Sequence, residues 1–291
     1  MEFKKAERCK AKLRLAITGP SGSGKTYSAL LIAQGLGGKV VMIDTENGSG
    51  NLYASDFDYD IGVITAPYDV RKYISAIHES EEAGYDVIII DSLSHAWAGE
   101  GGLLDMQGKI ADNSSSMNTW AAWRQVTPWH NRLLETILTS QCHVIATMRS
   151  KTEYAVIENE KGKKEPRKIG LAPVQRDGIE YEFTTVFDLN NEHIATVSKD
   201  RTNIFDGQFF LPSADTGAML KKWLDTGVDV KPRKVQQKEL WERYLKIADG
   251  NAEEAKNLMW VATGKMKFSD CTEADIEALI NDISRREQGL A

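Results

Sequence analysis

The segment that most constrains the fold is Gly19–Thr26, which reads GPSGSGKT. It fits the pattern G-x-x-x-x-G-K-[ST] at every fixed position. Glycines let a backbone turn through φ > 0 conformations and approach a ligand closely. The N–H groups of such a loop point inward and cradle phosphate oxygens at the start of a helix. The segment therefore predicts a phosphate-binding loop, while the plainer interpretation is a Gly/Ser-rich surface turn.

The sequence on either side of the loop favours phosphate binding. Residues 13–17 alternate with a period of two residues, as a strand does, and residues 27–36 carry one apolar helical stripe. Gly35, Gly37 and Gly38 are expected to end this helix. A strand before the loop and a helix after it form the context that the pattern requires.

Within the loop, a cation and a hydroxyl would do the chemistry. Lys25 is expected to reach the β- and γ-phosphates of a nucleotide, and the Thr26 hydroxyl is expected to hold Mg²⁺. ATP and Mg²⁺ are therefore the expected cofactors. The residues expected to bind the nucleotide are Gly19, Pro20, Ser21, Gly22, Ser23, Gly24, Lys25, Thr26 and Tyr27.

Strand and helix patterns alternate through the first half of the chain. The apolar runs are residues 39–44, 86–91 and 143–147, and the helical segments are 68–83 and 119–139, the latter bent or restarted near Pro128. Continuously apolar strands between helices indicate a parallel sheet covered on both faces. Segments 153–158, 180–189 and 194–198 are expected to add antiparallel strands. The predicted fold class is α/β, a P-loop NTPase core with a mostly parallel central sheet and antiparallel additions.

A change of pattern divides the chain near residue 227. Residues 227–236 lack periodicity and are predicted to link a domain of residues 1–226 to a small helical domain of residues 237–291. The small domain is predicted to contain three short helices. The last of them begins at a capping box that runs from Thr272 to Asp275.

Composition excludes several classes of protein. Because the formal net charge is −6, nucleic acid could bind only through a local basic patch. The three cysteines, Cys9, Cys142 and Cys271, show neither zinc-ligand spacing nor a disulfide framework. No apolar run approaches the roughly 18 residues of a membrane span, and we recognise no signal peptide. We therefore expect a cytoplasmic protein with no membrane partner.

Three charged residues follow predicted strands. Asp91 ends the run Val87–Ile90, which has the form of a Walker B strand whose acid binds Mg²⁺; the alternative is a buried strand that happens to end in Asp. Glu46 could orient and deprotonate the attacking water, or could be a solvated loop acid that caps a turn. Arg149 could sense the γ-phosphate, or could be an exposed strand-end charge.

Together these motifs resemble the RecA-like branch of P-loop ATPases over residues 10–226. Val41–Glu46, followed by Asn51–Ala54, resembles the segment that carries the catalytic glutamate of that branch, and Val87–Ser92 resembles its Walker B strand. The resemblance implies a RecA-like core that hydrolyses ATP, with the lysine of the loop and both acids in the site. Residues 168–178 look like a signature of phage-encoded ATP-binding proteins, some of which are single-strand annealing or recombination ATPases. The glutamine that ends the third strand in the family has no clear match here.

Ser198–Arg201 resembles the K-x-K or K-x-R pair with which the family reaches a neighbouring subunit's nucleotide. Lys199 and Arg201 are two residues apart, so on a strand they face the same way. The resemblance implies that both cations act in trans, like arginine fingers. It further implies a homo-oligomer, either a ring or a filament. The alternative is a solvated strand edge kept charged against aggregation.

A basic segment could provide the local patch for nucleic acid. Gly162 and Pro166 predict a loop, and the resemblance implies that loops at residues 108–118 and 158–178 line a channel for single-stranded DNA. The alternative is a solvated charged hairpin. The candidate DNA-binding cations are Lys161, Lys163, Lys164, Arg167 and Lys168.

Four tryptophans lie near the first of these loops, at positions 97, 120, 123 and 129. Their helical spacing favours the core, although one of them could stack on a base.

Three functions fit these observations. The first is an ATPase that acts on single-stranded DNA in phage-type recombination or replication. The second is a nucleotide-gated loading factor, in which residues 237–291 recruit a protein partner and hydrolysis is slow. The third is a P-loop kinase of a small metabolite, which the Glu46 segment and the lack of an evident Arg-rich lid disfavour.

Overall fold

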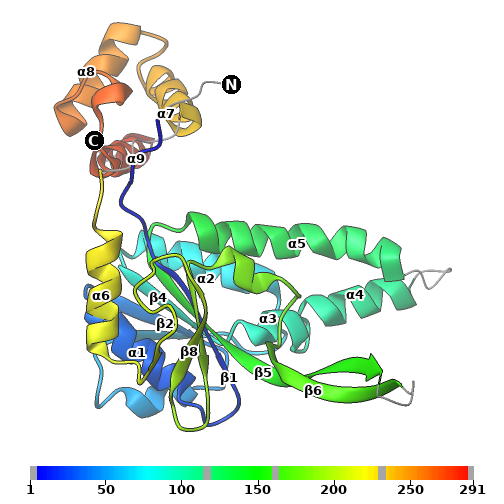
Figure 1. The fold of residues 1–291 in the computed structure, drawn as a ribbon. Helices are drawn as coiled ribbons and strands as arrows, with labels where there is room; N and C mark the ends of the chain where they lie inside the picture. Colours follow the sequence, from blue (N-terminus) through cyan, green and yellow to red (C-terminus); the bar gives the residue numbers. More distant parts are fainter. Residues whose placement is uncertain (1–4, 114–118, 159–163, 229–233, 288–291) are drawn as a thin grey trace. The chain divides into compact units, whose positions relative to one another are not determined.

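The computed structural model describes residues 5–113, 119–158, 164–228 and 234–287. The chain divides into two compact units (Figure 1). One unit is Lys12–Leu224, and the other joins Met1–Ala11 to Asp225–Ala291.

The larger unit is built on a sheet whose strands run mostly parallel. The strands are β1 (Arg14–Gly19), β2 (Val40–Asp44), β3 (Asp60–Val63), β4 (Val87–Asp91), β5 (His143–Glu158), β6 (Lys164–Pro173), β7 (Thr185–Leu189), β8 (Ala195–Asp200) and β9 (Phe209–Phe210). Their order is β3-β2-β4-β5-β1-β7-β8-β9, with β6 paired to β5 outside this path. Strands β3 to β7 along this order are parallel, whereas β6, β8 and β9 pair antiparallel with their neighbours. The predicted α/β class, with a mostly parallel sheet and antiparallel additions, is confirmed. The segment 180–189, expected to add an antiparallel strand, instead begins in a 3-10 turn at Ile179–Glu182 and continues as β7, which is parallel to β1.

The position of β5 between β1 and β4 decides where the strand ends meet. The register pairs Gly19 with Arg149 on one side of β5, and Ile90 with Ala146 on the other. The carboxyl ends of these three parallel strands therefore lie at one edge of the sheet. Ligands of open α/β sheets bind at this edge.

Helices cover both faces of the sheet. They are α1 (Lys25–Leu36), α2 (Val70–Glu82), α3 (Ser94–Ala98), α4 (Leu103–Asp112), α5 (Thr119–Thr139) and α6 (Ala214–Leu224), with the 3-10 turns η1 (Ser49–Tyr53) and η2 (Ile179–Glu182). One core lies between the sheet and helices α2 and α5, and the other lies between the sheet and helices α1 and α6. Neighbouring β4 residues alternate between the two cores, Ile88 and Ile90 in the first and Val87 and Ile89 in the second. This two-sided burial is why the strand is apolar throughout.

Part of the loop predicted at 108–118 is helical. Helix α4 extends to Asp112 because its apolar side chains, Leu103, Met106 and Ile110, share one helical face and pack on the core. Residues 114–118, which belong to the loop predicted at 108–118, lie outside the described residues. Helix α5 runs through Pro128 as one helix, so of the two expected possibilities, a bend or a restart, the restart does not occur.

The predicted basic loop at 158–178 is largely a strand. Residues 164–173 form β6, which pairs antiparallel with the outer half of β5, from Glu158↔Lys164 to Ser150↔Pro173. The resulting β5–β6 hairpin extends past the rest of the sheet in Figure 1. Lys164, Arg167 and Lys168 therefore lie on a strand, as in the hairpin alternative. Lys161 and Lys163 fall outside the described residues.

The second unit contains α7 (Lys234–Ile247), α8 (Ala252–Thr263), the 3-10 turn η3 (Phe268–Asp270) and α9 (Glu273–Glu287). These helices enclose their own core, to which Leu240, Tyr244, Met259 and Leu279 contribute. The predicted capping box is confirmed, because Asp275 Oδ2 accepts from Thr272 N over 2.8 Å and Thr272 Oγ1 accepts from Asp275 N over 3.3 Å.

Gly35 does not end α1, as the sequence analysis expected, but lies inside it. Its role is close packing against α6. A Cβ at Gly35 would lie 1.8 Å from Ala214 O, and a Cβ at Gly217 would lie 2.1 Å from Ile32 O. The two glycines let the backbones of α1 and α6 touch, which no other residue would permit.

We predict that Gly35→Ala destabilises the larger unit by about 1–3 kcal/mol, the usual cost of overpacking a core. The matched control is Gly108→Ala in α4, where a Cβ meets nothing within 4 Å. That control should gain up to about 1 kcal/mol from helix propensity. Urea unfolding measures both, and equal midpoints for Gly35→Ala and the wild type would contradict the contact.

Candidate nucleotide-binding and hydrolysis site

The structure has the predicted strand before the glycine-rich loop and the predicted helix after it. Strand β1 ends at Gly19 and α1 begins at Lys25. Gly22 and Gly24 have φ angles of 79° and 82°, in the left-handed region that favours glycine. Gly24 precedes α1 without a side-chain cap. The start of the helix therefore presents backbone N–H groups to an anion.

Lys25 and Ser23 indicate that the loop suits phosphate oxygens. Lys25 Nζ donates a 2.7 Å hydrogen bond to Pro20 O, so the cation lies across the loop. Burial lowers the pKa of Lys25, while the charges of Asp91 and Glu46 oppose the shift. Within the described part of the chain, the buried Ser23 Oγ has no hydrogen-bond partner. A partly buried cation and an unpartnered hydroxyl are donors that phosphate oxygens can satisfy.

Asp91 is held at the end of β4 by two threonine hydroxyls. Thr26 Oγ1 donates to Asp91 Oδ2 over 2.6 Å, and Thr147 Oγ1 donates to Asp91 Oδ1. Burial raises the pKa of Asp91, and both hydroxyl donors oppose that rise. A hydroxyl and a carboxylate fit Mg²⁺, which is usually held by one or two carboxylates together with substrate phosphates. The Thr26–Asp91 pair is therefore suited to the predicted Mg²⁺ site.

Glu46 lies at the same edge of the sheet, two residues after β2. The register of β2 and β4 pairs Asp44 with Asp91. Arg149 Nε donates to Glu46 Oε1 over 3.0 Å and Arg149 Nη2 forms an ion pair with Oε2. Ser92 Oγ also donates to Glu46 Oε1, over 3.2 Å.

The protonation state of Glu46 follows from these contacts. Burial alone would raise its pKa, but the hydrogen bonds and charge of Arg149 outweigh burial and hold the pKa below its ordinary value. The carboxylate is therefore ionised at neutral pH. That is the form able to orient water and to accept its proton.

Arg149 has a partner that neither interpretation of the sequence included, and its sensing of the γ-phosphate stays a prediction. Its side chain is 49% exposed, yet its guanidinium forms a two-pronged pair with Glu46 instead of pointing freely into solvent. Such bidentate pairs are strong and fix geometry. Arg149 therefore positions the predicted base. The sequence could not show this pairing because the partners are 103 positions apart.

A further set of residues, missed by the sequence analysis, supports the segment around the acids. Thr45 Oγ1 lies 2.7 Å from His95 Nδ1 and accepts a 2.8 Å hydrogen bond from Ser92 N. The His95 ring stacks on Tyr68 with centroids 4.6 Å apart. Burial, assisted by Arg149, lowers the pKa of His95, which favours the neutral ring. Thr45 precedes Glu46 and Ser92 follows Asp91 in the sequence. This adjacency to the predicted acids is the feature from which both residues could have been predicted.

Lys199 and Arg201 form contacts within their own chain. Lys199 Nζ donates to Glu180 O over 2.9 Å and to Tyr181 O over 2.5 Å, and Arg201 Nη2 donates to Tyr181 O over 3.3 Å. The shared acceptor shows that both cations project to one side, as their spacing predicted. Burial and the neighbouring guanidinium lower the pKa of Lys199. Action on a neighbouring subunit stays a prediction.

Three of the four tryptophans belong to the core. Trp97, Trp123 and Trp129 pack against the core beneath α2 and α5, and the rings of Trp97 and Trp123 stack with centroids 5.6 Å apart. The preference for core packing is confirmed for these three. Trp120 is 83% exposed at the start of α5, so it is the member of this group accessible to a base.

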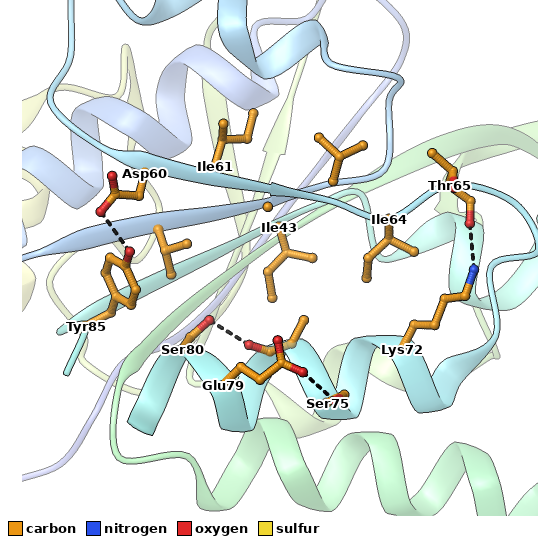
Figure 2. A pocket seen from close by; sticks show the side chains of 14 residues that line it. Ile43, Asp60, Ile61, Ile64, Thr65, Lys72, Ser75, Glu79, Ser80 and Tyr85 are labelled. Carbon is orange, nitrogen blue, oxygen red and sulfur yellow. Dashed lines mark hydrogen bonds between the residues drawn. The ribbon is translucent and has the colours of Figure 1, made fainter. Parts of the chain in front are cut away.

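A cavity of about 560 Å³ opens between β3 and α2 (Figure 2). None of the predicted site residues lines it. Its polar groups are engaged with one another: Tyr85 Oη donates to Asp60 Oδ2 over 2.7 Å, and Lys72 Nζ donates to Thr65 O over 3.0 Å. This cavity is therefore separate from the residues of the phosphate-binding loop. Among the described residues, no cluster of three or more His, Cys, Asp or Glu side chains could hold a metal ion by itself.

The fold and the loop define a P-loop ATPase of the α/β class. A family model described as an AAA domain matches residues 11–258. Because this match covers most of the chain, the protein belongs to the AAA-domain family, which implies nucleotide binding and hydrolysis. The match continues beyond residue 226 through α7 and into α8. No curated protein matches the chain.

Each helix in the described part of the chain is too short or too polar to cross a membrane.

We predict that Arg149→Met moves the acidic limb of the pH–rate profile for ATP turnover to higher pH. The reason is that Arg149 lowers the pKa of Glu46, so its removal lets that pKa rise and protonation begins at higher pH. Arg71→Met is the matched control, because it removes an Arg–carboxylate pair, Arg71–Asp69, elsewhere in the same unit. An unchanged acidic limb in Arg149→Met would show that the pair does not set the ionisation of Glu46.

Proposed function

We propose that the protein is a RecA-like ATPase that uses Mg²⁺ to hydrolyse ATP and acts on single-stranded DNA in phage-type recombination or replication. The observation that carries the proposal is the placement of Glu46. It follows β2, faces Arg149 at the end of the core half of β5, and shares the sheet edge with Asp91 and the phosphate-binding loop. A base positioned from this strand is the arrangement that the RecA-like resemblance implies.

The residues of the site divide the hydrolytic work. Lys25 would neutralise the β- and γ-phosphates, and Thr26 with Asp91 would hold Mg²⁺. The metal, when bound, supplies charge neutralisation at the phosphates. Glu46 would orient the attacking water and accept its proton. Arg149 donates to the same carboxylate that performs this step, so phosphate oxygens would compete with Glu46 for its guanidinium.

Lys199 and Arg201 support the proposal of a homo-oligomer. Lys199 lies on β8 and Arg201 directly follows it, and both donate to backbone carbonyls of η2. These are neutral acceptors, and a phosphate from a neighbouring subunit would be a stronger one. In a ring or filament the pair would act in trans on that nucleotide.

The β5–β6 hairpin supports the proposal of DNA binding. Strand β5 continues from Arg149 into the arm that pairs with β6. The sequence that follows β5, residues 161–168, contains the candidate DNA-binding cations. Because the chain as a whole is acidic, this segment is the local basic patch that a single strand would need. Trp120, exposed at the start of α5, is a second candidate contact through stacking.

The second unit supports an alternative function, that of a nucleotide-gated loading or recruitment factor. Its helices have a separate core, and α8 exposes Trp260 and Val261 to 52% and 66%. These apolar side chains could bind a protein partner while hydrolysis serves only as a slow reset. Removal of residues 227–291 distinguishes the two functions, because ATP turnover that is retained while partner binding is lost favours the recruitment factor.

We predict that Glu46→Gln lowers ATP turnover by at least about 10²-fold, the usual contribution of a positioned base. ATP binding should persist, because the loop and Asp91 are intact. Glu82→Gln, an exposed residue at the end of α2, is the control and should match the wild type. Normal turnover by Glu46→Gln would remove Glu46 from the mechanism.

We predict that single-stranded DNA stimulates ATP turnover and that its affinity falls steeply with salt. Lys163→Ala with Lys164→Ala should make the log–log salt slope shallower by roughly 0.7 for each lost phosphate contact. The control pair, Lys238→Ala with Lys256→Ala, removes the same charge from α7 and α8. Turnover that is indifferent to DNA at every salt concentration would contradict the DNA-dependent function.

A further inference from the structure

The turn between β7 and β8 lies against the phosphate-binding loop. Strand β7 is parallel to β1 and pairs Asp188 with Thr18, one residue before the loop begins. The turn that follows reaches both ends of the loop. A Cβ at Gly19 would lie 2.8 Å from Leu189 O, and a Cβ at Gly24 would lie 2.9 Å from His193 Nδ1.

The turn is held in one conformation by its own hydrogen bonds. Asn190 Oδ1 accepts from Glu192 N and from Ile194 N, each over 2.9 Å. The backbone pair Asn190 N to Ile194 O, at 3.1 Å, closes the turn. His193 has a φ of 65°, which places its side chain on Gly24. The imidazole is therefore positioned by the turn and does not lie there by chance.

The imidazole of His193 is chemically available. The residue is exposed, and the structure gives its ring nitrogens no hydrogen-bond partner among the described residues. A neutral imidazole offers one donor and one acceptor, and an imidazolium offers two donors. Either form could contact a phosphate oxygen or a sugar hydroxyl.

The strand order indicates which part of a nucleotide His193 would meet. Glu46 follows β2, and Asp91 and Arg149 lie on β4 and β5. These three strands are on one side of β1, whereas the turn follows β7 on the other side. The γ-phosphate must lie beside the hydrolytic residues. The other end of the triphosphate, with its α-phosphate and ribose, then points to the side of β7.

We propose that His193 is a binding residue for the ribose of a nucleoside triphosphate held in the loop. This inference rests on the proposed function, because it requires that the loop binds ATP. The proposed contact comes from outside the phosphate-binding loop. The turn that provides it follows Gly24 by more than 160 positions in the sequence.

The test compares ATP with inorganic tripolyphosphate, which has no ribose. Two variants retain the positive φ of the turn: His193→Gly removes the imidazole, and His193→Asn keeps a hydrogen-bonding side chain. We expect His193→Gly to weaken ATP binding by about threefold to tenfold, the loss for one hydrogen bond, and to leave tripolyphosphate affinity unchanged. His193→Asn should recover part of the ATP affinity. Glu192→Ala, an exposed neighbour in the same turn, is the matched control and should bind both ligands like the wild type.

Calorimetry of ATP and tripolyphosphate binding distinguishes the outcomes. Wild-type affinity for ATP in His193→Gly would overturn the proposal. An equal loss of ATP and tripolyphosphate affinity would also overturn it, because His193 would then only support the loop. If the wild-type protein binds no ATP, the proposed function itself fails, and with it this inference.

Discussion

The buried carboxylate of Asp91 is the interaction on which the site depends. A charge removed from water must be compensated, and here the compensation comes from Thr26 at the start of α1 and Thr147 on β5. These two hydrogen bonds connect the phosphate-binding loop, β4 and β5 through a single side chain. The same requirement explains why Asp91 lies where a divalent cation could bind, since a metal would compensate the charge more completely than hydroxyl groups do.

Strand β5 organises both acids of the site. Thr147 and Arg149 are two residues apart and therefore face the same way, the first toward Asp91 and the second toward Glu46. This arrangement depends on β5 lying beside β4, with β2 on the far side of β4, so that its side chains reach Asp91 and, beyond it, Glu46. Strand β5 is thus as important to the chemistry as the glycine-rich loop.

The parts of this molecule that could be predicted from sequence are those whose residue pattern lies within a short segment. The loop Gly19–Thr26, the apolar run before Asp91 and the capping box at Thr272 each have a pattern within a few residues, because each acts locally. The Arg149–Glu46 pair has no such pattern, since it arises from strand pairing across 103 positions.

Gly35 is a second feature whose role the local sequence pattern does not predict. As a glycine near the end of an apolar stripe it is typical of a helix terminus, and only the approach of α6 reveals that it serves packing. The basic segment was assigned to a loop because Gly162 and Pro166 usually break regular structure. Pairing with the outer half of β5 overrode that local preference for residues 164–173.

The length of β5 has a mechanical consequence. Glu158 lies nine residues after Arg149 on the same strand, and at about 3.3 Å per residue this separation spans about 30 Å. A paired strand resists stretching along its axis, although it can twist and bend. A strand of nucleic acid bound at the far end of the hairpin would therefore stay at a nearly constant distance from the guanidinium. Any signal between the two would have to travel as a twist or a bend of the hairpin.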